Sequence, residues 1–311
     1  DPALIEICAM DAPGLPIQLS TQASATNYET LNFWHGEGLE RVVLGREVTM
    51  EEIREIRNNT DVEIETFIHG AMCISYSGRC TLSNHMSQRD ANRGGCSQSC
   101  RWKYELFETP ELTERVSLLG GDPEEAFSMS AVDMAMIRHI PDLVDVGVDS
   151  LKIEGRMKSI HYVSTVSNVY SRAVDAYCND PENFEFDEAW EDELWKVAQR
   201  ELATGFYYGT PTEDQQLFGK RRKIPRYTFI GQVLDYDEAT GIATIQQRNH
   251  FAIGDEIEFY GPNFTHHTHV IEELWDEDGE PIERARHAMM TVKMKVNKPV
   301  KRLDMMRKLT G

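Results

Sequence analysis

Four cysteines close together in the sequence are the residues best suited to carry out chemistry. They lie within one 28-residue stretch, separated by six, fifteen and three intervening residues, at Cys73, Cys80, Cys96 and Cys100. The first residues of the chain lack the succession of a secretion signal, so we expect a cytoplasmic protein whose thiols stay reduced. Clustered cysteines in such a protein are more often metal ligands than disulfides.

The spacing of these cysteines is compatible with two kinds of metal centre. Four thiolates suit a tetrahedral zinc ion or a cubane iron–sulfur cluster. Structural zinc sites usually contain two short cysteine pairs, whereas only Cys96 and Cys100 are close here, which favours iron–sulfur. Gly78, Gly94 and Gly95 would let the backbone fold tightly around a small object. Buried thiols without a metal are the remaining alternative.

Charged residues at the end of a predicted strand, residues 150–153, form a second candidate group. Glu154 and Arg156 would lie at its carboxyl end, where an arginine can grip a ligand carboxylate or pair internally with Glu154. Lys152 would point into the interior of the domain, where a lysine needs a carboxylate or a ligand, and Glu65 is a natural partner. Lys152, Glu154 and Arg156 are therefore candidate catalytic residues.

His69 is the fourth candidate catalytic residue, because it comes just before the cysteines in the sequence. A histidine there could tune a cluster or move a proton near neutral pH, and a structural hydrogen bond is the alternative. Four arginines also surround the cysteines in the sequence and could offset thiolate charge or contact RNA phosphates. They are Arg79, Arg89, Arg93 and Arg101.

Alternating apolar and amphipathic stretches place these residues in an α/β domain. The predicted strands cover residues 17–20, 41–44, 62–68, 126–129 and 150–153, and the predicted helices cover residues 28–37, 49–58, 131–146 and 161–177. Repeated strand–helix units indicate a parallel sheet or a barrel. Polar residues gather just after several strands, where barrels of this kind place their chemistry.

A change in composition divides the chain into three parts. Residues 1–178 form the α/β domain with its cysteine-rich loop, 73–100, and residues 179–226 read as a helical or irregular linker or cap. Residues 227–311 contain short β-runs typical of a small antiparallel β-barrel, at 228–235, 241–247, 256–260, 267–274 and 289–296. We expect three histidines of this last part to be solvent-exposed: His266, His267 and His269.

The formal net charge of −20 disfavours non-specific nucleic-acid binding over the whole surface. Two basic clusters could still dock RNA locally, with solvated lysines as the alternative. They are Lys220, Arg221, Arg222, Lys223 and Arg226, and Lys293, Lys295, Lys298, Lys301, Arg302, Arg307 and Lys308. No stretch of eighteen apolar residues occurs, so no membrane partner is expected.

The sequence around the cysteines resembles the signature of peptidase family U32, the collagenase-like peptidases. The run from Glu65 to Cys73 carries the resemblance, and it continues through Gly78, Cys80, Leu82 and Ser83. The runs 92–96, 100–102 and 149–159 also resemble blocks of this family. The tRNA hydroxylation proteins are the branch of the family that the sequence resembles most.

This resemblance implies a fold and an activity. The fold is a TIM-type (β/α) barrel, here partial because its first strands and helices would precede Asp1, followed by the small β-barrel domain. The activity is an oxygen-independent hydroxylation of the wobble uridine of tRNA to 5-hydroxyuridine, with prephenate as co-substrate. A [4Fe–4S] cluster held by the four clustered cysteines would serve as cofactor, and a homologous subunit of the family is a further expected partner.

Two alternatives compete with this hydroxylase function. A collagenase-like peptidase would be a hydrolase, but the sequence contains neither a His-Glu-x-x-His helix nor a Gly-x-Ser-x-Gly elbow. A clustered cysteine with His69 or His85 as base remains an option, although it would leave three thiols unexplained. The other alternative is a non-catalytic module with a structural zinc site.

Overall fold

The computed structural model describes residues 1–105, 128–217 and 225–310. The chain forms two compact units, each made of two segments. Unit 1 comprises Asp1–Arg156 with Arg200–Lys223, and unit 2 comprises Met157–Gln199 with Ile224–Gly311. Among the described residues, no helix is long and apolar enough to cross a membrane.

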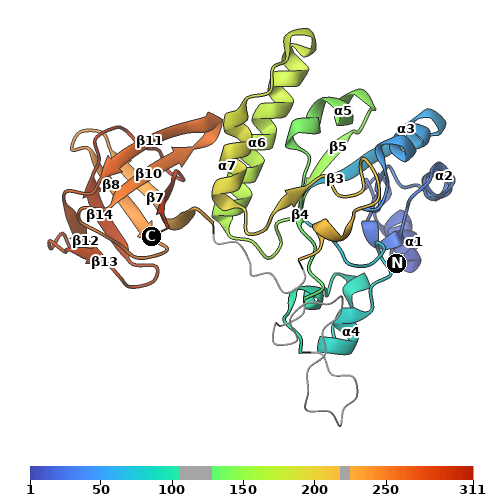
Figure 1. Cartoon of the computed structure of the whole chain (residues 1–311), viewed down its shortest axis with the longest axis horizontal. Coiled ribbons are helices and arrows are strands. Elements are labelled where there is room, and N and C mark those ends of the chain that lie inside the picture. Colours follow the sequence, from blue (N-terminus) through green and yellow to red (C-terminus); the bar gives the residue numbers. More distant parts are fainter. Residues whose placement is uncertain (106–127, 218–224, 311) are drawn as a thin grey trace. The chain divides into compact units, whose positions relative to one another are not determined.

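A largely parallel sheet forms the centre of unit 1 (Figure 1). Its strands follow the order β1 (Gln18–Leu19), β2 (Arg41–Val43), β3 (Glu63–Ala71), β4 (Asp133–Ala135) and β6 (Leu202–Ala203), and β5 (Ser150–Ile153) also pairs with β3. All the pairings are parallel except the one between β3 and β4. The predicted mixed α/β domain with a largely parallel sheet is therefore confirmed.

Helices connect the strands of unit 1. The α-helices are α1 (Pro2–Asp11), α2 (Tyr28–Gly36), α3 (Met50–Asn59), α4 (Leu82–Ser87) and α5 (Ile140–Asp145), and the 3-10 helices are η1 (Thr21–Ala23), η2 (Ala91–Arg93), η3 (Ser99–Arg101), η4 (Ile137–His139) and η6 (Glu213–Gln215). Helix α3 begins with a capping box between Thr49 and Glu52, and it buries Ile53 and Ile56 on one face.

The segment before α5 differs from the prediction. A helix was expected over residues 131–146, but β4 occupies its first half and α5 begins only at Ile140, with Pro141 in its first turn. Proline favours the start of a helix and disfavours its interior, which explains the break. The strand expected at 126–129 falls partly outside the described residues, and Ser128 and Met129 are not in a strand.

Unit 2 combines two helices with an antiparallel sheet. Helices α6 (Ile160–Asn179) and α7 (Glu188–Val197) contact each other, and η5 (Pro181–Asn183) lies between them in the chain. The sheet has the order β11 (Thr265–Val270), β10 (Glu256–Gly261), β15 (Met305–Leu309), β7 (Tyr227–Asp237), β8 (Ile242–Gln247), β14 (Thr291–Lys295) and β12 (Leu274–Asp276), with η7 (Pro262–Phe264) in a loop. Strands β9 (Phe251–Ala252) and β13 (Arg284–Ala285) form a separate pair. All of these pairings are antiparallel, which confirms an antiparallel β-sheet domain.

The units do not follow the predicted division at residues 178 and 226. Helix α6 groups with the β-rich unit, because its neighbour α7 is part of that unit. The segment expected to be a linker contributes α7 to unit 2 and β6 to unit 1, where β6 pairs with β4.

A buried ionic cluster links α7 to the sheet of unit 2. Arg307 on β15 is 0% exposed, and its guanidinium donates to Glu193 on α7 and, at 2.6 Å, to Glu258 on β10. Lys196 lies 2.8 Å from Glu193 and 3.7 Å from Glu258. Arg307 is therefore unavailable to RNA, contrary to its place in the predicted basic cluster, and Lys308 is engaged with Asp255 at 2.7 Å.

The histidines of β11 are less exposed than the sequence suggested. His269 is 6% exposed, and His266 and His267 are half-buried. His267 stacks on Phe259, and His266 lies 3.1 Å from Glu258. The expectation that these histidines are solvent-exposed was wrong, because His269 is buried and the other two pack against Phe259 and Glu258 of the neighbouring strand β10.

Candidate four-thiol site

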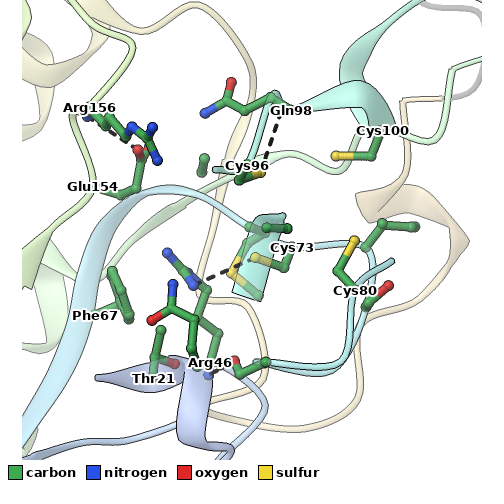
Figure 2. A pocket seen from close by; sticks show the side chains of 18 of the residues that line it. Thr21, Arg46, Phe67, Cys73, Cys80, Cys96, Gln98, Cys100, Glu154 and Arg156 are labelled. Atoms are coloured by element: carbon green, nitrogen blue, oxygen red, sulfur yellow. Dashed lines mark hydrogen bonds between the residues drawn. The ribbon is translucent and has the colours of Figure 1, made fainter. Parts of the chain in front are cut away.

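All four clustered cysteines line one cavity of about 340 Å³ in unit 1. Figure 2 shows their sulfur atoms around a common space. Cys73 and Cys96 are exposed to it, and Cys80 and Cys100 are half-buried. The structure therefore brings the four clustered cysteines of the sequence to one cavity.

The carboxyl ends of the parallel strands supply the rest of the cavity wall. Thr21 follows β1, Arg46 follows β2, Cys73 follows β3, and Glu154 and Arg156 follow β5. Parallel strands end at the same edge of a sheet, so side chains that follow them meet there. The expectation that polar residues after the strands form the site agrees with this arrangement.

Two glycines allow the cysteine-bearing segment to approach the strand ends. Gly70 has φ +104°, and a Cβ there would lie 2.3 Å from the backbone oxygen of Glu154. Gly78 has φ +74°, and a Cβ there would lie 2.1 Å from the carbonyl oxygen of Gln22. No residue with a side chain fits either position without movement of the backbone. These two glycines, which lie between Glu65 and Cys80, therefore permit the close approach of this segment to Glu154 and Gln22.

Hydrogen bonds fix the segment that carries the cysteines. The carboxylate of Glu47 accepts from the backbone N–H of Ser77 at 3.1 Å and from its hydroxyl at 2.8 Å, between Cys73 and Cys80. Before Cys100, the hydroxyl of Ser97 lies 2.9 Å from that of Ser87 and 2.8 Å from that of Ser99. Each half of the segment is therefore anchored without using a thiol.

The environment of the thiols controls their charge. Burial raises the pKa of Cys100 to about 11, and removal of water by surrounding protein atoms also raises the pKa of Cys73. The neighbouring thiols raise both values further, while Arg46 lowers the pKa of Cys73 and Arg101 lowers both. The raised pKa values keep Cys73 and Cys100 protonated at neutral pH without a cation, so a bound metal would have to displace their protons.

Two N–H groups point at sulfur atoms. The guanidinium of Arg46 lies 3.6 Å from the Sγ of Cys73, and the backbone N–H of Gln98 lies 3.4 Å from the Sγ of Cys96. Arg46 is held in place over the ring of Phe67, 3.5 Å from its centroid. Gln98 presents its N–H from a left-handed conformation, φ 55°. Sequence reasoning missed these contacts with the thiols.

Arg101 contributes a second, more deeply buried positive charge. Its guanidinium lies 3.2 Å from the carboxylate of Asp133 and donates to the carbonyl of Met72 at 3.2 Å. Arg200 also lies 3.3 Å from Asp133. Of the four arginines predicted to surround the thiols, Arg101 lines the cavity.

The candidate catalytic residues of β5 lie at the same cavity. Lys152 forms the expected ion pair with Glu65, at 2.7 Å. The backbone N–H of Arg156 donates to Oε1 of Glu154 at 3.2 Å, and the guanidinium of Arg156 donates to the carbonyl of Gly94. Lys152, Glu154 and Arg156 all line the cavity, whereas no ion pair joins the side chains of Glu154 and Arg156 in the described structure.

His69 lies elsewhere. It is 2% exposed within β3, and its backbone carbonyl accepts from the N–H of Glu154 at 2.9 Å. The imidazole does not belong to the cavity wall that the described residues form. His69 therefore lies in the sheet beside the site, and its side chain does not contact the cavity in the described part of the chain.

The described residues contain no group of three or more His, Cys, Asp or Glu side chains placed to hold a single metal ion. A tetrahedral zinc ion with Zn–S bonds of about 2.3 Å needs sulfur atoms only about 3.8 Å apart. The four thiols thus surround a space together without meeting at one point (Figure 2).

Comparisons with known proteins cover nearly the whole chain. A model of the family described as "Peptidase family U32" matches residues 1–217, and a model of "Peptidase family U32 C-terminal domain" matches residues 225–307. The chain is 53% identical to the tRNA hydroxylation protein P1 of Bacillus subtilis, over 99% of this chain and 72% of that protein.

Two further proteins are similar to parts of the chain. A protein named collagenase from Porphyromonas gingivalis is 35% identical over 80% of this chain and 61% of its own length. The crystal structure of the C-terminal domain of a U32-type protein from Geobacillus thermoleovorans is 56% identical, with a TM-score of 0.26, over 26% of this chain and 99% of that domain.

Proposed function

The chain belongs to peptidase family U32, and we propose that it acts in the enzymatic hydroxylation of tRNA. The observation that carries this proposal is the 53% identity to a tRNA hydroxylation protein over 99% of the chain. The proposed reaction is the oxygen-independent conversion of the wobble uridine to 5-hydroxyuridine, with prephenate as co-substrate. A tRNA substrate places this activity in the cytoplasm.

We propose that Cys73, Cys80, Cys96 and Cys100 hold a [4Fe–4S] cluster. The donor set suits such a cluster, because four thiols line one cavity. A cluster attaches each cysteine to a separate iron and so needs a wider set of sulfurs than zinc does. When bound, it would supply one-electron redox chemistry beside the cavity.

The protein's own residues would bind and orient the reactants. Arg46 and Arg101 offset the negative charge of the thiolates, because one guanidinium touches a sulfur and the other lies near two thiols. One N–H group of the Arg156 guanidinium donates to the carbonyl of Gly94, and its other N–H groups would donate to a carboxylate of the co-substrate. Lys152 is neutralised by Glu65 and maintains the shape of the cavity.

The parallel sheet of unit 1 supports the proposal of a (β/α) barrel. Its strands place chemically active side chains at their carboxyl ends, which is the arrangement such barrels use. The sheet of unit 2 would correspondingly be a small β-barrel. The two proposed barrels are thus specific forms of the α/β fold of unit 1 and of the antiparallel sheet of unit 2.

The test of the proposed function is the nucleoside content of tRNA. A strain that lacks the gene is complemented with wild-type protein, with Cys96→Ser or with Cys178→Ser, and 5-hydroxyuridine is measured by mass spectrometry. Cys178 lies on α6, in unit 2, and is exposed, so it is a matched control. We expect wild type and the control to restore the nucleoside and Cys96→Ser to fail. Equal nucleoside levels with and without the wild-type gene would refute the proposal.

A peptidase activity is the second candidate, because the collagenase relative is 35% identical to this chain. A cysteine nucleophile would need a nearby base, and His69 is buried in β3 away from the cavity wall. Gelatin cleavage by the purified protein, absent in all four single cysteine-to-serine variants of the cavity, would support a role for the thiols in hydrolysis. A non-catalytic module with structural zinc would lack both activities.

A further inference from the structure

Tyr76 presents an exposed aromatic ring at the four-thiol cavity. Its exposed fraction is 73%, and both Tyr76 and the nearby Ile74, which is 41% exposed, line the cavity. The two residues lie between Cys73 and Cys80, on the segment that follows β3. Because the ring is accessible to solvent, a ligand that enters the cavity can reach it without displacing protein atoms.

Hydrogen bonds hold the backbone that carries this ring. The hydroxyl of Ser77 donates to the carboxylate of Glu47 at 2.8 Å and accepts from the backbone N–H of Arg46 at 3.1 Å. The backbone carbonyl of Tyr76 accepts from the N–H of Arg79 at 3.1 Å, which closes a turn. The ring therefore extends from a fixed backbone, and a ligand that contacts it would not have to order a flexible loop.

The cavity wall beside the ring carries positive charge. Four cations line it, against the carboxylate of Glu154 alone among the described residues, and they are Arg46, Arg101, Lys152 and Arg156. The guanidinium of Arg46 contacts a thiol and that of Arg156 contacts a backbone carbonyl, so neither is neutralised by the group it contacts. The wall therefore attracts an anionic ligand, such as a nucleic acid with its phosphates.

We propose that the ring of Tyr76 stacks on the target base of the tRNA anticodon loop and holds this base at the four-thiol cavity. Proteins bind unpaired bases by stacking them on aromatic side chains, while nearby cations hold the flanking phosphates. A cavity of about 340 Å³ lies within the range of small-ligand pockets. The inference rests on the proposed tRNA function and adds to it the residue that holds the base.

The test removes the ring and the base separately. The probes are two anticodon stem–loops that differ only in carrying a uracil or no base at the target position, and their dissociation constants are measured by fluorescence anisotropy without oxygen. Tyr76→Leu removes the aromatic face but keeps an apolar side chain, whereas Tyr76→Phe keeps the ring. Phe33→Leu is the matched control, because Phe33 is a 60% exposed aromatic residue on α2, outside the cavity wall that the described residues form.

We expect wild type, Tyr76→Phe and Phe33→Leu to bind the uracil probe at least about ten-fold more tightly than the abasic probe, and Tyr76→Leu to lose this preference. The midpoint of thermal unfolding of Tyr76→Leu should equal that of wild type, because the ring is exposed. A wild type without the preference, a Tyr76→Leu variant that keeps it, or equal weakening of both probes would overturn the inference. The proposed function is tested separately by the tRNA nucleoside, so restored 5-hydroxyuridine with any of these results would reject only the role of Tyr76.

Discussion

Replacement of Arg307 by methionine should destabilise unit 2 strongly and reverse its response to acid. In the wild type, burial acts to raise the pKa of Glu258, but hydrogen bonds from His266 and Arg307 outweigh it and lower the value to about 2. At Glu193, burial also acts to raise the pKa, but the hydrogen bond from Arg307 lowers it, and the net pKa is lowered. Arg307 is thus the shared partner of two carboxylates.

The magnitude follows from these contacts. Relative to an ordinary value of 4.5, a Glu258 pKa of about 2 corresponds to about 3 kcal/mol of stability at neutral pH. Removal of one partner from a buried ion pair costs about 3–5 kcal/mol. Lys196 remains near both carboxylates, so we expect the lower end, about 3 kcal/mol.

The pH dependence has opposite signs in the two proteins. Because the folded-state pKa of Glu258 is depressed, the wild type keeps this stability above about pH 4.5 and loses it as the pH falls toward 2. In Arg307→Met, burial without the guanidinium would raise both carboxyl pKa values. The variant should therefore gain stability as the pH falls from 7 through those raised values.

Hydrogen exchange of peptides from α7 and β10 measures this stability within unit 2. A loss of about 3 kcal/mol corresponds to roughly 100-fold faster exchange through unfolding. Lys308→Met is the matched control on the same strand, because its partner Asp255 is partly exposed and such pairs contribute about 1 kcal/mol or less. Equal effects of the two substitutions, or an Arg307→Met variant that still loses stability between pH 7 and 5, would refute the reasoning.

Three further perturbations test unit 1. Lys152→Met removes the nearer of two cations from the carboxylate of Glu65, which is 9% exposed and keeps Arg41 at 3.9 Å. The midpoint of thermal unfolding should fall by several degrees, for a cost of about 1–3 kcal/mol, and no shift would contradict the pairing. Gly70→Ala introduces a Cβ 2.3 Å from a backbone oxygen after β5, and should lower the yield of folded protein or the midpoint more than Lys152→Met does. Arg46→Gln removes a charged donor from the Sγ of Cys73, so the reduction potential of a reconstituted cluster should become more negative in a potentiometric titration; an unchanged potential would argue against the contact.

The strand ends and the cysteine cluster could be predicted because local signals specify them. A parallel sheet brings residues after its strands to one edge, so Arg46, Cys73 and Glu154 meet there once the strands are recognised. The Lys152–Glu65 pair also followed from alternation along two strands, β3 and β5, that proved to be neighbours.

Other features depend on contacts between distant parts of the chain. The short strand β4 is antiparallel to β3, and its buried Asp133 is held by Arg101 and Arg200, which no local pattern reveals. Arg307 looked like one of several surface cations, because its carboxylate partners lie 49 and 114 residues away in sequence. Burial of a charge is decided by such partners and not by its sequence neighbours.

The contact between Arg46 and Cys73 was missed for the same reason. It depends on the way the guanidinium lies over Phe67, a side-chain arrangement that strand prediction does not provide.

The most direct test of the account is the metal and acid-labile sulfide content of protein purified without oxygen, together with its visible absorption spectrum. We expect about four irons and four sulfides per chain in wild type and in the Cys178→Ser control, and loss of both in Cys96→Ser. Stoichiometric zinc without sulfide would contradict the proposed redox site and would instead indicate a structural metal in the four-thiol cavity.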